Sequence, residues 1–151
     1  MDLKDFDNNA DKKPEDTKTL GYDWEFGHEE LMLEVATYKH DNRLYVGLYH
    51  KDEDGYDESF CDLTINLPNM PVKKGEAYID DFASKSKLEF IKKHKLGKVL
   101  PDMGFSGMSS YHKVAFDLKR LEEFDKQGVE RYHSLNGIEN KKRKNRTEKA
   151  R

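Results

Sequence analysis

Hydrophobic and polar residues alternate along the middle of the chain with the period of two that is typical of β-strands. The alternation runs over residues 31–36, 43–51 and 60–67, and turn or loop residues separate these segments. Side chains of a strand point alternately to its two faces, so each segment predicts a strand with one buried face. Three consecutive strands joined by short connections predict an antiparallel meander.

The second half of the chain predicts two helices and two further strands. Ser86 and Glu89 have the spacing of a capping box, so a helix is expected to begin there and to end at a left-handed Gly97. Asp117 can cap a second helix, which we expect to end near Gly128. The other expected elements are strands over residues 77–79 and 111–116 and a glycine-containing loop over residues 101–110.

This order of elements predicts an α+β fold. We expect one antiparallel sheet, made of the three-stranded meander plus one or two further strands, with two helices packed on one side and flexible termini. Residues 1–19 have almost no apolar side chains and are interpreted as a flexible acidic leader. Residues 20–137 are expected to form a single domain, and residues 138–151 a basic disordered tail.

Charge is distributed unevenly along the 151 residues, although the formal net charge is only -3. Residues 1–70 carry 7 basic and 18 acidic side chains, residues 71–137 carry 13 and 10, and residues 138–151 carry 7 and 2. Such asymmetry points to charged macromolecular partners. No apolar run approaches the roughly 18 residues that span a bilayer, and the first residues do not resemble a signal peptide, so we expect a cytoplasmic protein without membrane contact.

The sequence contains no pattern that predicts catalysis or metal binding. None of the six histidines forms the helical pair with an intervening Glu that hydrolytic zinc sites use, and the only cysteine, Cys61, has no partner for a disulfide. Residues 104–108 resemble a nucleophile elbow, but Met108 stands where that turn needs its final glycine. Asp80 and Asp81 are expected on an exposed loop. We therefore expect a protein that is not an enzyme and needs no cofactor.

A cluster of acidic residues in the loop after residue 51 is the first candidate for binding. Its carboxylates could mimic phosphates toward a protein whose groove normally holds nucleic acid, or could simply keep a hairpin loop soluble. The cluster consists of Asp52, Glu53, Asp54, Asp57 and Glu58.

Basic residues favour a second interpretation, in which the chain binds DNA or RNA directly. A lysine-rich helix and a basic tail could follow a phosphate backbone, although a solvated helix face has the same appearance in sequence. Two tyrosines on one face of the central strand could stack on bases, or could pack against the helix bearing Leu88 and Ile91. The residues concerned are Lys85, Lys87, Lys92, Lys93, Lys95, Lys141, Lys142, Arg143, Lys144, Arg146, Tyr45 and Tyr49.

Several short motifs in a fixed order resemble an uncharacterised bacterial family. They are LYVGLY at residues 44–49, DLTINLP at 62–68, AYID at 77–80, Ser106-Gly107, Tyr111, and FDL at 116–118. Together they resemble, over residues 43–121, a domain of unknown function frequent in Firmicutes and in their plasmids, phages and conjugative transposons. The resemblance implies an accessory protein of a mobile element and assigns no activity.

The leading hypothesis from the sequence is a non-enzymatic interaction protein of a mobile element. By analogy with small acidic proteins of such elements, we expect an inhibitor of a host defence nuclease, of the anti-CRISPR or anti-restriction type, that binds through the acidic loop. The alternative is an accessory protein that binds DNA or RNA directly through the lysine-rich helix and the basic tail.

Overall fold

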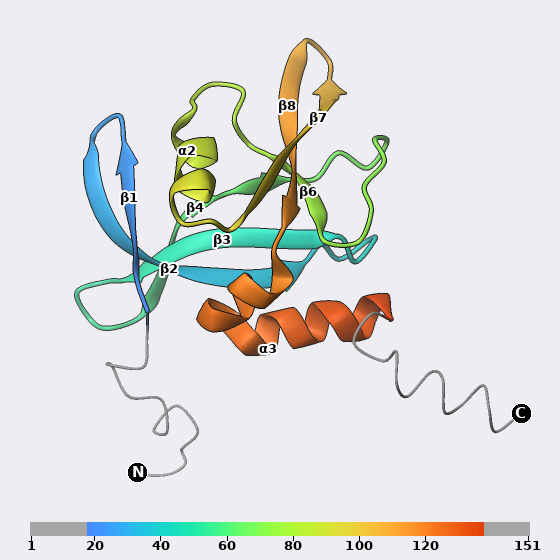
Figure 1. The fold of residues 1–151 in the computed structure, drawn as a ribbon. Helices are drawn as coiled ribbons and strands as arrows, with labels where there is room; N and C mark the ends of the chain where they lie inside the picture. The colour runs from blue at the N-terminus through green and yellow to red at the C-terminus, as the bar shows by residue number, and fades with distance from the viewer. Residues whose placement is uncertain (1–17, 138–151) are drawn as a thin grey trace, which may run out of the picture.

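The computed structural model describes residues 18–137, which form two four-stranded antiparallel sheets and two helices. The predicted α+β fold is therefore confirmed (Figure 1). The predicted leader, apart from its last two residues, and the predicted basic tail lie outside the described residues. The elements are β1 (Leu20–Trp24), β2 (Gly27–Thr37), β3 (Leu44–Lys51), β4 (Asp57–Asp62), β5 (Thr64–Ile65), β6 (Glu76–Ile79), α2 (Ser86–Lys93), β7 (Gly97–Ser106), β8 (Ser109–Phe116) and α3 (Leu118–Asn136).

The first sheet has the strand order β1-β2-β3-β4 and contains the predicted meander. Strands β2, β3 and β4 pair antiparallel in sequence order. The prediction missed β1, which pairs with the first half of β2 and buries Leu20 and Tyr22. Leu20, Tyr22 and Trp24 alternate with Gly21 and Asp23, but the strand is only 5 residues long, and the prediction overlooked this short signal.

The second sheet has the strand order β5-β6-β8-β7, and the chain crosses into it at Leu63, the residue between β4 and β5. A single strand over residues 60–67 was predicted, and this is wrong because β4 and β5 belong to different sheets. The Leu63 amide donates to the Val46 carbonyl at 2.9 Å, and the Leu63 carbonyl accepts from the Asp80 amide at 2.9 Å. Through these two hydrogen bonds Leu63 links the first sheet to the segment that follows β6, and its side chain is fully buried.

Helix α2 begins at Ser86 as predicted, but it lacks the predicted capping box and ends at Lys93, before Gly97. Its N-cap is Lys85 and makes no side-chain capping bond, because the Ser86 hydroxyl is instead 2.8 Å from the Tyr22 hydroxyl. After the helix the left-handed conformation belongs to Lys95 (φ 58°), whereas Gly97 begins β7. A Cβ atom at Gly97 would lie 2.7 Å from the Ala115 carbonyl oxygen, so this glycine allows close strand pairing.

The expected loop over residues 101–110 is a β-hairpin formed by β7 and β8, which projects from the body of the molecule (Figure 1). Pro101 lies where the register shifts between Val99 and Met103. Strand β7 is at the edge of its sheet, so a residue without an N–H is tolerated there. The prediction failed because proline and glycine are signals for loops in most sequences.

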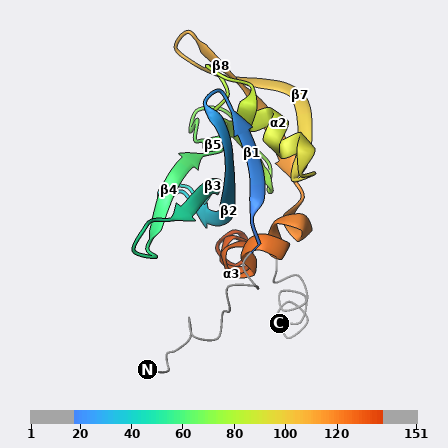
Figure 2. The same ribbon diagram turned by 90° about the vertical axis from the view of Figure 1, so that its left-hand side faces the viewer.

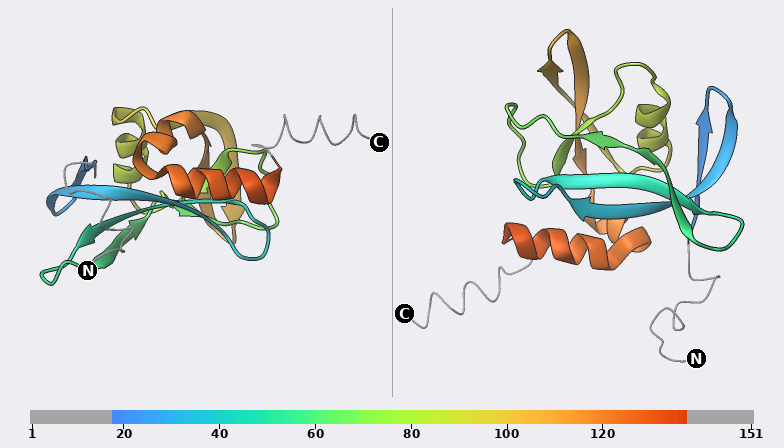
Figure 3. Two further views of the ribbon diagram at one scale, coloured as in Figure 1. Left: turned by 90° about the horizontal axis from the view of Figure 1, so that it is seen from below. Right: turned by 180° about the vertical axis from the view of Figure 1, so that it is seen from behind.

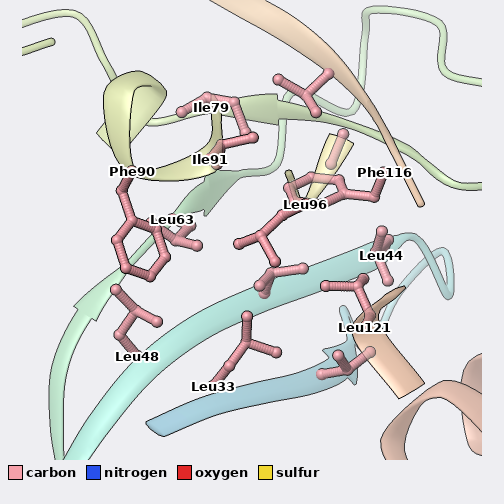
Figure 4. Packing of buried hydrophobic residues seen from close by; sticks show 14 of the residues in the cluster. Leu33, Leu44, Leu48, Leu63, Ile79, Phe90, Ile91, Leu96, Phe116 and Leu121 are labelled. Carbon is pink, nitrogen blue, oxygen red and sulfur yellow. The ribbon is translucent and has the colours of Figure 1, made fainter. Parts of the chain in front are cut away.

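One hydrophobic core joins both sheets and both helices. Leu33 and Leu48 of the first sheet, Ile79 of the second, Ile91 of α2 and Leu121 of α3 all point into it (Figure 4). Figure 2 shows α2 and β7 on one side of the first sheet. The side chains that alternate with the core residues of β2 and β3 therefore form an outer face.

Helix α3 runs alongside β2 (Figure 3) and covers the part of its edge beyond β1, where no strand of residues 18–137 pairs with it. It was expected to end near Gly128, but it continues to Asn136. A Cβ atom at Gly128 would lie 2.2 Å from the Val35 carbonyl oxygen, so this glycine permits the helix to approach the strand. Glycine inside a helix lowers its stability, but at this position close packing against the strand leaves no room for a side chain.

Candidate functional site

A pocket of about 360 Å³ lies where strands β2, β3 and β4 meet helix α3. Its volume is within the range of small ligand sites, which is about 300–1,000 Å³. Three of the seven lining residues are carboxylates and two are aromatic. The lining residues are Leu33, Glu34, Tyr49, Asp57, Ser59, Phe124 and Asp125.

Strand register brings acidic side chains from distant parts of the sequence to this outer face. Glu34 of β2 and Asp62 of β4 both pair with Gly47 of the central strand. Tyr49 pairs with Ser59, and Lys51 with Asp57, on the same strands. We refer to Glu34, Asp57, Asp62 and Asp125 as the acidic face.

The acidic face is only partly neutralised by basic residues. Lys51 forms an ion pair with Asp57 at 2.5 Å, and no ion pair to Glu34 or Asp125 occurs within residues 18–137. Burial raises the pKa of Glu34, and the negative charges of Asp125, Asp57 and Asp62 raise it further. A positively charged side chain of a partner would relieve this repulsion between like charges.

Asp125 also has a structural task at the edge of β2. Its carboxylate accepts hydrogen bonds from the Val35 amide at 2.9 Å and from the Gly128 amide at 3.0 Å. The backbone of Asp125 departs from helical angles (φ -151°, ψ 78°), which turns the carboxylate toward the strand. This aspartate therefore fixes α3 beside the sheet and at the same time contributes charge to the pocket.

Tyr45 shares the outer face of the central strand with Tyr49, as predicted, but its side chain lies over Gly47 and reaches Asp62. Its hydroxyl donates to the Asp62 carboxylate at 2.6 Å, and a Cβ at Gly47 would lie only 2.2 Å from that hydroxyl. Burial raises the pKa of Tyr45, and the Asp62 carboxylate adds to this effect. Tyr49 forms part of the pocket wall, and the expected packing of both tyrosines against α2 is wrong because Leu88 and Ile91 belong to the core on the opposite face.

The predicted acidic loop is partly occupied by its own structure. Asp52 accepts hydrogen bonds from the amides of Asp54 and Tyr56, each at 2.9 Å, and so holds the turn together. Glu58 lies 3.3 Å from the imidazole of His50. Glu53 and Asp54 are exposed at the tip, so Asp57 is the member of the loop that contributes to the pocket.

The lysines of α2 do not form one free basic surface. Lys87 forms an ion pair with Asp80 at 3.2 Å, and Lys93 with Asp23 at 3.3 Å. Lys85, Lys92 and Lys95 are exposed. The basic residues of the second hypothesis at positions 141–144 and 146 lie outside the described residues.

Asp81 is buried, in contrast to the exposed loop predicted for it. Its carboxylate accepts from the His112 amide at 3.1 Å and lies 2.6 Å from the His112 Nδ1 atom. In residues 18–137 no hydroxyl or thiol is hydrogen-bonded to His112, so the pair lacks the nucleophile of a catalytic triad. The pair therefore secures strand β8 next to the end of β6.

Other chemistry finds little support in the described part of the chain. No group of three or more His, Cys, Asp or Glu side chains there could hold a metal ion. Burial raises the pKa of Cys61 to about 11, which keeps this cysteine as a thiol near neutral pH. Among residues 18–137 no helix has the length and apolar character required to cross a membrane.

Sequence reasoning missed Glu34, Asp125 and the pocket itself. Glu34 was interpreted only as a polar position of an alternating strand, and Asp125 as part of a helix close to its end. Their polar character was visible in the sequence, but their proximity to Asp57 depends on strand register and on the position of α3 beside β2. No local pattern reports either of these.

Comparisons with known proteins identify a family but no characterised relative. Neither the curated proteins nor the solved structures give a match. A family model described as a domain of unknown function, DUF4313, matches residues 32–135, which is more than half of the chain. The match extends beyond the region of resemblance at both ends and includes every residue of the acidic face. The chain therefore belongs to the DUF4313 family.

Proposed function

We propose that the protein is a non-enzymatic interaction protein that binds a basic groove of another macromolecule through its acidic face. The observation that carries this proposal is the pocket in which Glu34, Asp57 and Asp125 meet beside Tyr49. Among residues 18–137, Lys51 is the one basic residue that forms an ion pair with these carboxylates. A lysine or arginine side chain fits such a pocket by charge and by contact with an aromatic wall.

The partner class that suits this face is a protein whose groove normally holds nucleic acid. Such grooves are lined with lysine and arginine, and an acidic protein surface can occupy them in place of phosphates. The resemblance to proteins of bacterial mobile elements supports a host defence nuclease as the partner. In that case the protein acts as an inhibitor of the anti-CRISPR or anti-restriction type.

The test compares two pairs of charge reversals that alter net charge equally. Glu34→Lys with Asp57→Lys changes the pocket, whereas Glu53→Lys with Asp54→Lys changes the loop tip. We expect the pocket pair to weaken binding to a CRISPR effector or a restriction nuclease at least about tenfold, a loss of about 1.4 kcal/mol. DNA cleavage and direct binding by the nuclease are measured with each variant, and circular dichroism confirms that the variants fold.

The outcomes separate the face from the loop. Equal losses with both pairs would indicate a general charge effect, and a loss with the loop pair alone would move the site to residues 53 and 54. If no nuclease of either class is bound or inhibited by the unaltered protein, the proposal fails.

Direct nucleic-acid binding is the rival function. Ion pairs neutralise two of the five lysines in and next to α2 that were named above, which weakens this interpretation. A gel-shift assay with DNA and RNA at increasing salt decides the matter, because phosphate binding weakens steeply through counterion release. Salt-sensitive retardation by the full chain would support the rival.

A further inference from the structure

The acidic face lies beside the helix that leads into the most basic segment of the chain. Helix α3 contributes Phe124 and Asp125 to the pocket and ends at Asn136, five residues before Lys141. Residues 141–146 contain five basic side chains and no apolar one. The charges of the face and of this segment are complementary, and they belong to the same chain.

The length of the connection permits contact between the two. From Asp125 to Asn136 the helix spans about 16 Å at 1.5 Å per residue. An extended chain covers up to about 3.5 Å per residue, so Lys141 can reach about 17 Å from Asn136 and Arg146 about 35 Å. The segment from residue 141 to 146 therefore brackets the distance back to the pocket.

Other surfaces near the end of α3 suit a basic segment less well. Lys73 and Lys74 line the surface around Asn136, and the Lys74 ammonium donates to the Asn136 carbonyl. Of the nearby acids, Asp41 is 3.7 Å from the Arg43 guanidinium, and Glu76 is 3.6 Å from the Lys113 ammonium. On the acidic face, by contrast, the ion pair of Lys51 with Asp57 is the one ion pair found within residues 18–137.

We propose that residues 141–146 dock on the acidic face of the same molecule and compete there with the partner. A tethered segment has an effective concentration in the millimolar range, so even a weak contact is substantially occupied. A strongly basic groove would displace the segment, whereas weakly basic proteins would not. The docking of residues 141–146 does not depend on the proposed function, whereas the competition with a partner rests on it.

The test uses the full chain and nuclear magnetic resonance of backbone amides. One variant replaces Lys141, Lys142, Arg143, Lys144 and Arg146 with glutamine, and a control replaces Lys85, Lys92 and Lys95, in and next to α2, in the same way. We expect the first variant to shift the amides of Gly47, Tyr49 and Ser59 relative to the unaltered protein, and the control to leave them unchanged. The differences should vanish in about 1 M salt, where the Debye length is about 3 Å.

A second experiment measures competition with polylysine as the probe. Neutralising residues 141–146 should raise the affinity of the full chain for polylysine at least about threefold, because the segment no longer occupies the face. The same change in a chain that carries Glu34→Gln and Asp57→Asn should have little effect. An unchanged affinity would overturn the competition.

The outcomes distinguish this inference from the proposed function. Unchanged amide shifts at the face, or shifts confined to another surface, would overturn the docking even if a nuclease is bound. Shifts at the face without any nuclease binding would leave the docking standing and reject the proposed function. If labelled, tail-neutralised protein shows the face shifts on addition of unlabelled unaltered protein, docking occurs between molecules and the intramolecular proposal is wrong.

Discussion

Two glutamates of strand β2 have opposite electrostatic surroundings although they are four residues apart. The pKa of Glu30 is lowered because His28 donates a hydrogen bond to its carboxylate at 2.7 Å and Thr19 donates another. The pKa of Glu34 is raised by burial and by three neighbouring carboxylates. Both side chains are acids of one strand, so the difference arises from the elements that the fold places beside each.

At the Glu30 end of β2, acids and bases alternate in space. His28 lies between Asp23 and Glu30, and Lys93 of α2 reaches Asp23 at 3.3 Å. At the Glu34 end, α3 brings Asp125 and β4 brings Asp57 and Asp62. A high local count of charged residues in the sequence thus says less about binding than whether the fold supplies counter-charges.

The largest effect on this contrast should come from lifting α3 away from β2. Gly128→Ala places a methyl group 2.2 Å from the Val35 carbonyl oxygen, which is backbone and cannot swing aside. We expect a loss of about 3 kcal/mol of unfolding free energy, at the upper end for overpacked sites, and a weakened pocket. Urea unfolding measures the change, with an unchanged m-value indicating an effect on stability alone.

Gly47→Ala is the matched control for that substitution. The added methyl group would also lie 2.2 Å from an oxygen, but this is the Tyr45 hydroxyl at the end of a side chain that can rotate. Loss of the bond between Tyr45 and Asp62 should cost about 1 kcal/mol. Equal costs for the two alanines would contradict the view that backbone contact fixes the position of α3.

The sequence was sufficient for the elements that rest on local patterns. Alternation predicted the strand segments of β2, β3 and β8, and the Asp117 cap of α3 is confirmed by its bond to the Arg120 amide at 3.2 Å. Local patterns misjudged Gly97 and Gly128, which were expected to end helices. Both glycines are needed for close approach to a neighbouring element, and that neighbour is distant in sequence.

The acidic face could be predicted only in part for the same reason. Asp57 was among the predicted binding residues because the charge density of its loop is a local property. Its meeting with Glu34 and Asp125 requires the register of three strands and the position of α3. Long-range pairing of this kind leaves no trace in the spacing of charges along the chain.

A smaller effect should follow from removing the charge of Glu34. Its pKa is higher in the folded protein than its ordinary value of 4.5, so the folded state favours the protonated form. The corresponding stability is present at low pH and is lost as pH rises from 4.5 through the raised pKa. Glu34→Gln should therefore stabilise the protein at pH 7, by a few tenths of a kcal/mol given its solvent exposure.

Glu30→Gln is the control for this pH dependence. The pKa of Glu30 is lowered in the folded protein, so its contribution is present above 4.5 and is lost as pH falls through the lowered pKa. The two variants should shift the urea midpoint at pH 7 in opposite directions. A shift in the same direction would mean that the two ends of β2 do not differ in solution.

The smallest effect concerns His28, which is exposed but lies between two carboxylates. Hydrogen bonds to Asp23 and then to Glu30 raise the pKa of His28 above its ordinary value of 6.5. Its stabilising charge is therefore present below pH 6.5 and is lost as pH rises through the raised pKa. Titration of the imidazole by nuclear magnetic resonance should show the pKa falling in Asp23→Asn, and falling less in Glu30→Gln.

The effect of salt on the His28 pKa tests whether the ion pairs at this end of β2 form in solution. The Asp23, His28 and Glu30 side chains are exposed, so added salt should screen their attraction and lower the pKa of His28. Lys93→Gln, which removes the cation beyond Asp23, should move the His28 pKa in the opposite sense, since a positive neighbour disfavours the imidazolium. If the His28 pKa responds to neither change, the ion pairs at the Glu30 end do not form in solution. The two ends of β2 would then not differ in how far their acids are neutralised, and the acidic face would no longer stand out.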